Sequence, residues 1–188
     1  MNLNELLLKK RQTILKKWFD SVLETYPQDT ANFLKRQKDQ FANPVGSTIY
    51  NGMDSLLEEL LNGGDTDKIS TFLDNIIRIR AIQDFTPSQA LAFVIQLKRV
   101  VREELINENK ESQFADELLA FERRADDLML LSFDIYMKCR EKIYDLKANE
   151  LRNMTSKLLE RANLIFEAQY RKIDLEEGLQ GNKLERGE

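Results

Sequence analysis

The stretch DFTPSQALAFVIQLKRVV, residues 84–101, decides the fold of this 188-residue chain. Thr86 is a good N-cap, Pro87 suits the first helical position and Gln89 completes a capping box, so a helix is predicted to start here. The residues from Ala90 to Ile95 are all apolar and cover nearly the whole circumference of that helix. Because such a helix must be covered by other helices on several sides, we expect it to be the central helix of the fold.

The rest of the chain has the apolar periodicity of helices, and no segment shows the alternation of a strand. Asn43 and Pro44 are predicted to open a helix that Gly63 ends, because proline favours the first helical turn and glycine the residue after the last one. Asp65 is predicted to cap the next helix. Helices are therefore expected over residues 4–26, 30–40, 44–61, 66–79 and 86–102, and residues 113–172 are expected to form one or two long helices. The predicted fold class is all-α.

Composition excludes several classes of function. The net charge of −4 leaves no excess of basic residues to neutralise phosphates, so nucleic acid is not expected as a partner. The chain has no histidine, which excludes histidine-ligated haem, a Ser-His-Asp triad and the Glu-x-x-His ligands of di-iron bundles. One cysteine, Cys139, is too few for structural zinc or an internal disulfide. We expect no catalytic residue, no cofactor and no metal ligand, and therefore no enzyme.

The N-terminal segment lacks the pattern of a secretion signal, because the leucines at 6–8 precede the basic residues at 9–11 instead of following them. No apolar run is long enough to span a bilayer, so we expect a cytoplasmic protein without stable membrane insertion. The basic residues at 9–11, together with Lys16 and Lys17, are expected to face solvent. Contact of this cluster with anionic lipid or an acidic partner is the alternative.

Two acidic patches and the single cysteine each have a structural and a functional interpretation. Glu103, Glu104 and Glu108, and the acidic residues within 116–127, are interleaved with arginines, so ion pairs on a solvated face are favoured over a metal site. Cys139 is expected to be a small apolar residue on a packed helix. Basic residues stand on both sides of it and favour a thiolate, so a redox role is the alternative.

The long C-terminal helix carries an apolar residue at every seventh position from Leu130 to Ile165. Three positions after these residues the pattern is mixed, because Phe133 is apolar whereas Arg140 and Lys147 are charged. Only half of a coiled-coil seam is therefore apolar. This pattern favours lateral packing of the helix on a partner over a long coiled coil. The predicted dimer or partner interface consists of Leu130, Met137, Tyr144, Leu151, Met154, Leu158 and Ile165.

Three segments of the chain resemble one known family: WFDSVLETYP (18–27), FANPVGSTIYNGMDSLLEEL (41–60) and IRIRAIQDFTPSQALAFVIQLKRVVREEL (77–105). Over roughly residues 6–144 the chain is similar to the N-terminal domain of RsbRD-type RsbT co-antagonist proteins. The resemblance implies a dimeric, non-haem globin-like helical sandwich of about seven helices. In that family the domain precedes a phosphorylatable STAS domain in bacterial stressosome complexes, and it is thought to be the sensory input module, with its last helix carrying the signal onward.

The division into domains follows from the same comparison. Residues 1–145 are expected to form the globin-like domain, 146–172 a dimerisation helix and 173–188 a disordered tail. Only sixteen residues follow Lys172, so no STAS domain is expected in this chain and the resemblance implies the input half alone.

The leading hypothesis for function is a signal-transduction module for stress-response regulation that homodimerises and docks on a protein partner of unknown identity. Two alternatives stay open. One is a sensor that binds a small apolar ligand in a pocket beside Phe93 and Ile95. The other, implied by the setting of stand-alone family members, is an accessory or assembly factor of a membrane-linked sulfite-reduction redox complex.

Overall fold

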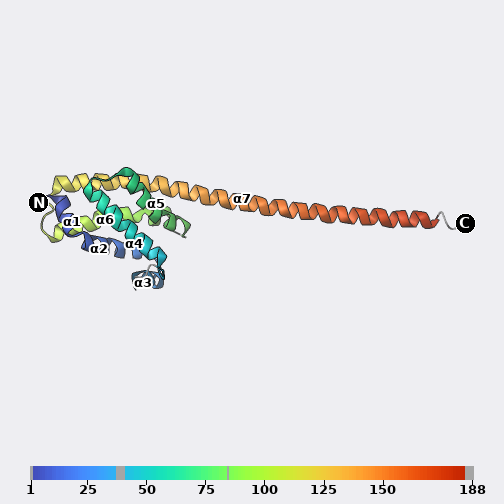
Figure 1. Cartoon of the computed structure of the whole chain (residues 1–188), viewed down its shortest axis with the longest axis horizontal. Helices are drawn as coiled ribbons and strands as arrows, with labels where there is room; N and C mark the ends of the chain where they lie inside the picture. The colour runs from blue at the N-terminus through green and yellow to red at the C-terminus, as the bar shows by residue number, and fades with distance from the viewer. Residues whose placement is uncertain (1, 37–40, 84, 185–188) are drawn as a thin grey trace. The chain divides into compact units, whose positions relative to one another are not determined.

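The computed structural model describes residues 2–36, 41–83 and 85–184, with side chains described as far as Arg171. The chain divides into two compact units, Met1–Glu141 (unit 1) and Lys142–Glu188 (unit 2). The described residues form seven helices and no strand (Figure 1). The helices are α1 (Leu3–Lys9), α2 (Arg11–Leu23), α3 (Gln28–Arg36), α4 (Pro44–Asn62), α5 (Thr66–Ile82), α6 (Pro87–Asn107) and α7 (Ala115–Leu184). The expected all-α fold class is confirmed, and the helical domain is consistent with a globin-like fold.

The predicted helix boundaries at Asn43, Gly63 and Thr86 are confirmed. The Asn43 side chain accepts a hydrogen bond from the backbone N–H of Gly46 at 2.9 Å, and Gly63 ends α4 with a φ of +97°. That φ would strain any residue with a Cβ, so the backbone conformation at this position requires glycine. Thr86 caps α6, and the Gln89 side chain accepts a hydrogen bond from the Thr86 backbone N–H at 3.0 Å.

The N-terminal segment differs from the expectation of one helix over residues 4–26. It forms two helices, because the backbone leaves the helical conformation at Lys10, where φ is −97° and ψ is 6°. The Lys10 ammonium lies 3.1 Å from Glu104 Oε2 and 2.5 Å from Glu108 Oε1. The break thus coincides with ion pairs to α6, which are remote in sequence.

Two further boundaries differ at the ends of helices. α3 begins earlier than predicted, and residues 37–40 of the predicted helix lie outside the described residues. α7 is a single helix that continues to Leu184, through most of the segment expected to be a disordered tail. Leucine, glutamate, glutamine and lysine are good helix formers and dominate that segment, so its glycines do not end the helix. Residues 185–188 of the expected tail lie outside the described residues.

The middle of α6 packs against α2 in the core of unit 1. The Trp18 indole N–H donates a hydrogen bond to the Phe93 carbonyl at 2.6 Å, and the two rings stack with their centroids 6.3 Å apart. Both side chains are buried. The expectation that α6 is covered on nearly every side is only partly correct, because Ile95 is 48% exposed. α6 therefore leaves part of its apolar run open to solvent.

Helices α4 and α5 approach closely at Gly52. A Cβ on this residue would lie 2.9 Å from Ile76 Cγ1 and 3.7 Å from the Phe72 carbonyl oxygen, both on α5. The absence of a side chain at Gly52 therefore sets how near the two backbones lie.

Arg80 is fully buried near the end of α5 and connects that helix to the first turn of α6. Its Nε donates to the Ala90 carbonyl at 2.9 Å, and one Nη donates to the Gln89 carbonyl at 2.8 Å. The guanidinium also lies 4.5 Å from the centroid of the Phe85 ring. Carbonyl oxygens and an aromatic face thus replace the water that this cation loses on burial.

Glu104 is buried on α6, so the expectation of a solvated face is wrong for this residue, whereas Glu103 and Glu108 are exposed as expected. Its carboxylate accepts hydrogen bonds from the ammonium groups of Lys10, at 3.1 Å, and Lys17. Burial alone would raise the pKa of Glu104, but the hydrogen bonds from Lys17 and Lys10 outweigh burial and hold the pKa below its ordinary value. The charged Glu104 therefore joins the N-terminal helices to α6.

We predict that Glu104→Gln makes the stability of unit 1 less sensitive to acid. A carboxyl whose pKa is lower in the folded state stabilises the fold fully above its ordinary value of 4.5. That contribution is lost as the pH falls below 4.5 toward the folded-state pKa. The Tm of the wild type should thus decrease more steeply in this range than the Tm of Glu104→Gln.

Thermal unfolding followed by circular dichroism at a series of pH values measures the difference. Glu103→Gln is the control, because Glu103 is the exposed neighbour on the same helix. If the Tm of the wild type and the Tm of Glu104→Gln changed with pH in parallel, the carboxylate of Glu104 would not be a source of the acid sensitivity.

Candidate protein-docking surfaces

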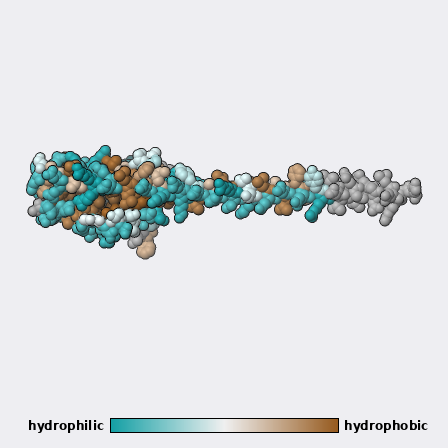
Figure 2. Space-filling model, turned by 90° about the horizontal axis from the view of Figure 1, so that it is seen from above, coloured by the Kyte–Doolittle hydropathy of each residue, from teal (hydrophilic) through white to brown (hydrophobic). Residues whose placement is uncertain are grey.

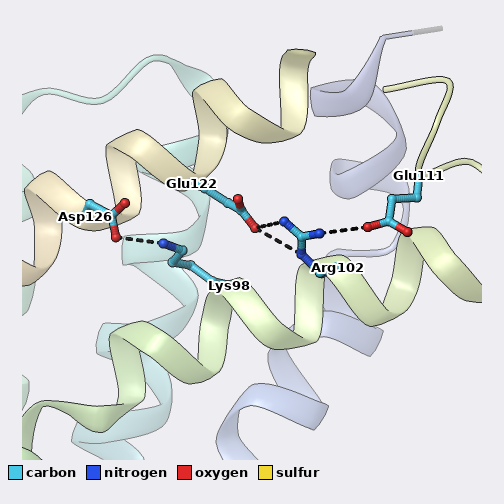
Figure 3. A network of polar contacts seen from close by, with 5 residues as sticks. All are labelled: Lys98, Arg102, Glu111, Glu122 and Asp126. Carbon is cyan, nitrogen blue, oxygen red and sulfur yellow. Dashed lines mark hydrogen bonds and ion pairs between the residues drawn. The ribbon is translucent and has the colours of Figure 1, made fainter. Parts of the chain in front are cut away.

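Ion pairs connect α6 to α7 within unit 1 (Figure 3). Lys98 Nζ lies 2.7 Å from Asp126 Oδ1, and Arg102 Nη2 lies 2.7 Å from Glu122 Oε1. Arg102 also contacts Glu111, which lies before α7, at 2.8 Å. A step of four residues forward on α6 is a step of four residues back on α7, so the two helices run antiparallel here. We call these three contacts the α6–α7 ladder.

The ladder contributes little to the stability of the fold. A hydrogen bond with Glu122 is the main cause that raises the pKa of Arg102 above its ordinary value. Arg102 and Glu111 are nevertheless largely exposed, so each pair is worth only about 0–1 kcal/mol and is weakened by salt.

Exposed apolar side chains on the same two helices accompany the ladder, and we call this surface the α6–α7 face. Its apolar members are Ile95 and Ile106 on α6 and Leu119, Leu130, Phe133 and Met137 on α7. Leu130 is the most exposed of them, at 68%. Figure 2 shows hydrophobic and hydrophilic atoms side by side on unit 1. The predicted interface residues Leu130 and Met137 belong to this face, whereas Ile106 and Leu119 were not predicted.

In unit 2, α7 exposes large apolar side chains along its described length. Figure 2 shows hydrophobic patches recurring along this helix among hydrophilic atoms. Between residues 142 and 171 only Ile143 is half-buried, and the other side chains are exposed. The large apolar residues exposed there are Tyr144, Leu146, Leu151, Met154, Leu158, Leu159, Leu164, Ile165, Phe166 and Tyr170. Tyr144, Leu151, Met154, Leu158 and Ile165 of the predicted interface are among them.

Small residues complete the seven-residue repeat of unit 2. Ala148, Thr155 and Ala162 each follow a large member of the repeat by four positions, so they lie on the same helix face. The Thr155 hydroxyl donates to the Leu151 carbonyl at 2.8 Å, which leaves the methyl group available for packing. The charged residues three positions after Tyr144 and Leu158 hid this alternation in the sequence. We call the following residues the unit 2 row: Tyr144, Ala148, Leu151, Thr155, Leu158, Ala162 and Ile165.

Phe93 and Ile95, predicted to border an apolar pocket, point to different surroundings. Phe93 is buried against Trp18, whereas Ile95 belongs to the α6–α7 face. Neither residue lines the hollows described around α2, α3 and α4. A pocket at this pair stays a prediction.

The basic cluster near the N-terminus makes ion pairs within unit 1. Lys10 and Lys17 bind Glu104, and Arg11 Nε lies 2.8 Å from Asp54 Oδ1. Much of the positive charge available for a lipid surface or an acidic partner is therefore already balanced.

Cys139 is half-buried and packs against the hydrophobic core, the setting that was favoured over a reactive thiolate. In the part of the chain that the structure describes, no three His, Cys, Asp or Glu side chains are grouped so that they would hold a metal ion.

Comparison with known proteins finds a family match for much of the chain. Residues 12–151 match the family model of the RsbT co-antagonist protein rsbRD N-terminal domain. An uncharacterized protein of Archaeoglobus fulgidus is 26% identical over 145 residues, which cover 74% of this chain and 83% of that protein. No solved structure matches the chain. Among the described helices, none has the length and apolarity needed to cross a membrane.

Arg102→Met is predicted to lower the free energy of unfolding by about 0.5–1 kcal/mol at low ionic strength, because two exposed ion pairs are lost. The loss should shrink at about 1 M salt, where exposed charges are screened. Urea unfolding at the two salt concentrations measures both values. Arg99→Met is the control, since Arg99 is exposed on α6 and forms no ion pair among the described residues. Equal losses for the two variants would rule out the role of the ladder.

Proposed function

Because the chain belongs to the RsbRD N-terminal domain family, we propose that it is a haem-free, globin-like regulatory module without catalytic activity. Unit 2 pairs with a second copy through the unit 2 row, and the α6–α7 face docks a different protein that receives the signal. The observation that carries the proposal is the row of exposed apolar side chains on unit 2.

An unpartnered helix of this composition is poorly stabilised. Helices in proteins take most of their stability from packing of an apolar face, and isolated helices are marginal in water. Burial of one large apolar side chain contributes about 1.5–3 kcal/mol. The large members of the unit 2 row, each more than half exposed, therefore supply a strong driving force for pairing.

A second copy of the chain is a suitable occupant for this row, because it presents the same alternation of large and small residues. Leu151 and Leu158 of one copy have Ala148, Thr155 and Ala162 of the other as sites of close approach. Interfaces of this type, in which the same patch is used on both subunits, are the commonest in soluble oligomers.

The α6–α7 face has the character of a surface for a transient partner. Its apolar residues are separated by the charged ladder, with Arg102 and Asp126 among the exposed members. Interfaces between proteins that associate and separate are about as apolar as the rest of the surface and carry many polar contacts. α7 contributes residues to both surfaces. A change in the packing of this helix at one surface can therefore alter binding at the other.

Leu151→Glu combined with Leu158→Glu is predicted to convert a dimer into a monomer, because the carboxylates would have to be buried without partners. Native mass spectrometry should show twice 22.0 kDa for the wild type and a single 22.0 kDa chain for the variant.

The chain offers a matched control on the opposite side of the same helix. Leu146 and Leu164 are 62% and 64% exposed, against 65% and 63% for Leu151 and Leu158, but they lie on the far face from the unit 2 row. Leu146→Glu with Leu164→Glu should leave the dimer intact. A monomeric wild type, or equal effects of the two double variants, would refute pairing through the row.

A photo-reactive amino acid at Leu130 is predicted to cross-link the partner in cells, because Leu130 is the most exposed apolar residue of the α6–α7 face. Mass spectrometry of the adduct identifies the protein, and Phe133→Glu in the same chain should abolish it. The same probe at the exposed Lys68 of α5 serves as control. An adduct formed only with a second copy, or none at all, would exclude a docking role for this face.

A further inference from the structure

A hollow of about 700 Å³ lies in unit 1 between α2, α3 and the first half of α4. Phe19, Leu34 and Tyr50 supply its apolar lining, and Phe19 and Leu34 are buried. The Phe19 and Tyr50 rings meet edge to face with their centroids 5.2 Å apart. Ligand sites for small molecules fall in this range of volume and combine apolar walls with a few polar groups.

The wall where α3 meets α4 is held in place by hydrogen bonds. The Asn43 side chain donates to the Leu34 carbonyl at 3.0 Å and accepts from the Gly46 backbone N–H at 2.9 Å. A Cβ at Gly46 would come within 2.4 Å of the Asn43 amide nitrogen, so glycine is needed for this contact. The wall therefore exists before any ligand arrives, which lowers the cost of binding.

The positively charged side chains that line the hollow outnumber the negatively charged ones. Lys35 Nζ lies 2.8 Å from Asp20 Oδ1, so these two lining residues neutralise each other. Lys16 also lines the hollow, and no carboxylate among the described residues forms an ion pair with it. Its neighbour Lys17, by contrast, is bound to Glu104. One positive charge is therefore left for a ligand.

Neutral hydrogen-bonding groups stand near this charge. Gln12, Ser47, Tyr50 and Asn51 line the hollow. Burial is the main cause that raises the pKa of Tyr50, so its phenol stays protonated at neutral pH and acts as a donor. The Tyr50 hydroxyl has no hydrogen-bond partner among the described residues. An ammonium and a phenol beside aromatic and aliphatic walls suit an acceptor with negative charge on an apolar body.

We propose that this hollow binds a small organic monocarboxylate with a flat apolar body, its carboxylate at Lys16 and Tyr50 and its body against Phe19 and Leu34. None of the residues that line this site belongs to the α6–α7 face or to the unit 2 row, and Phe93 is not among them. It gives unit 1 a place where a metabolite biases the packing of α2, α3 and α4.

Three probes of the same shape test the charge. 4-Phenylbutyrate, its neutral amide and 4-phenylbutylamine are titrated into the full chain, and binding is followed by Tm and by backbone amide chemical shifts. The carboxylate should raise the Tm, because a ligand selective for the folded state stabilises it. The shift changes should map to α2, α3 and α4. Equal binding of all three probes, no binding, or shift changes confined to unit 2 would overturn the proposal.

Variants then test the residues. Lys16→Met should weaken binding of the carboxylate about threefold to fivefold, the range for one exposed charge pair. Tyr50→Phe should weaken it about fivefold, the effect of one hydrogen bond. Lys157→Met, an exposed lysine of unit 2, is the matched control and should change nothing.

A space-filling variant keeps the test independent of charge. Ser47→Phe places a ring in the hollow from the α4 wall and should abolish binding of every probe, with the folded spectrum retained. Retained affinity in Ser47→Phe, or in Lys16→Met and Tyr50→Phe together, would place the ligand elsewhere.

Discussion

Apolar side chains on a helix lower the free energy of a protein only when another surface covers them, and this constraint governs unit 2. There large apolar residues of α7 are exposed, among them those of the seven-residue repeat. The alternation with Ala148, Thr155 and Ala162 is the pattern that the proposed pairing with a second helix uses. The family match and the exposed row therefore support the same interpretation, a module that works in contact with other proteins.

Unit 1 meets the same constraint with its own residues. Trp18 stacks on Phe93, Gly52 lets α4 approach α5, and the core extends through every helix of the unit. Two buried charges accompany this apolar core. Arg80 finds carbonyl oxygens and Glu104 finds two lysines, so neither charge is left without compensation. These polar contacts connect elements that are far apart in sequence and leave little freedom in how the helices pack.

The sequence predicted what depends on neighbouring residues. The starts of α4 and α6 are encoded by Asn43-Pro44 and Thr86-Pro87, whose effects act within one helical turn. The break at Lys10 was not predictable, because it accompanies ion pairs with residues about a hundred positions away. The same reason explains Ile95, which sits in an apolar run and yet lies on an exposed face. Only the packing of neighbouring helices decides which side of such a helix is covered.

The surfaces were partly predictable for the same reason. The exposed repeat on α7 can be read from its spacing, and the small residues at the fourth position were visible but obscured by charges at the third. The α6–α7 ladder and the hollow between α2, α3 and α4 arise from three-dimensional neighbours, so no local pattern indicates them.

The unit 2 row has a further consequence for how such a module behaves inside a cell. If unit 2 pairs as proposed, association of two chains is a bimolecular step, so the paired fraction would rise with the amount of protein, whereas the folding of unit 1 would not. If the helix of unit 2 is stable only when paired, the amount of the protein in the cell would itself control how much of it is active. Synthesis and degradation of the protein would then set its output as directly as any bound molecule.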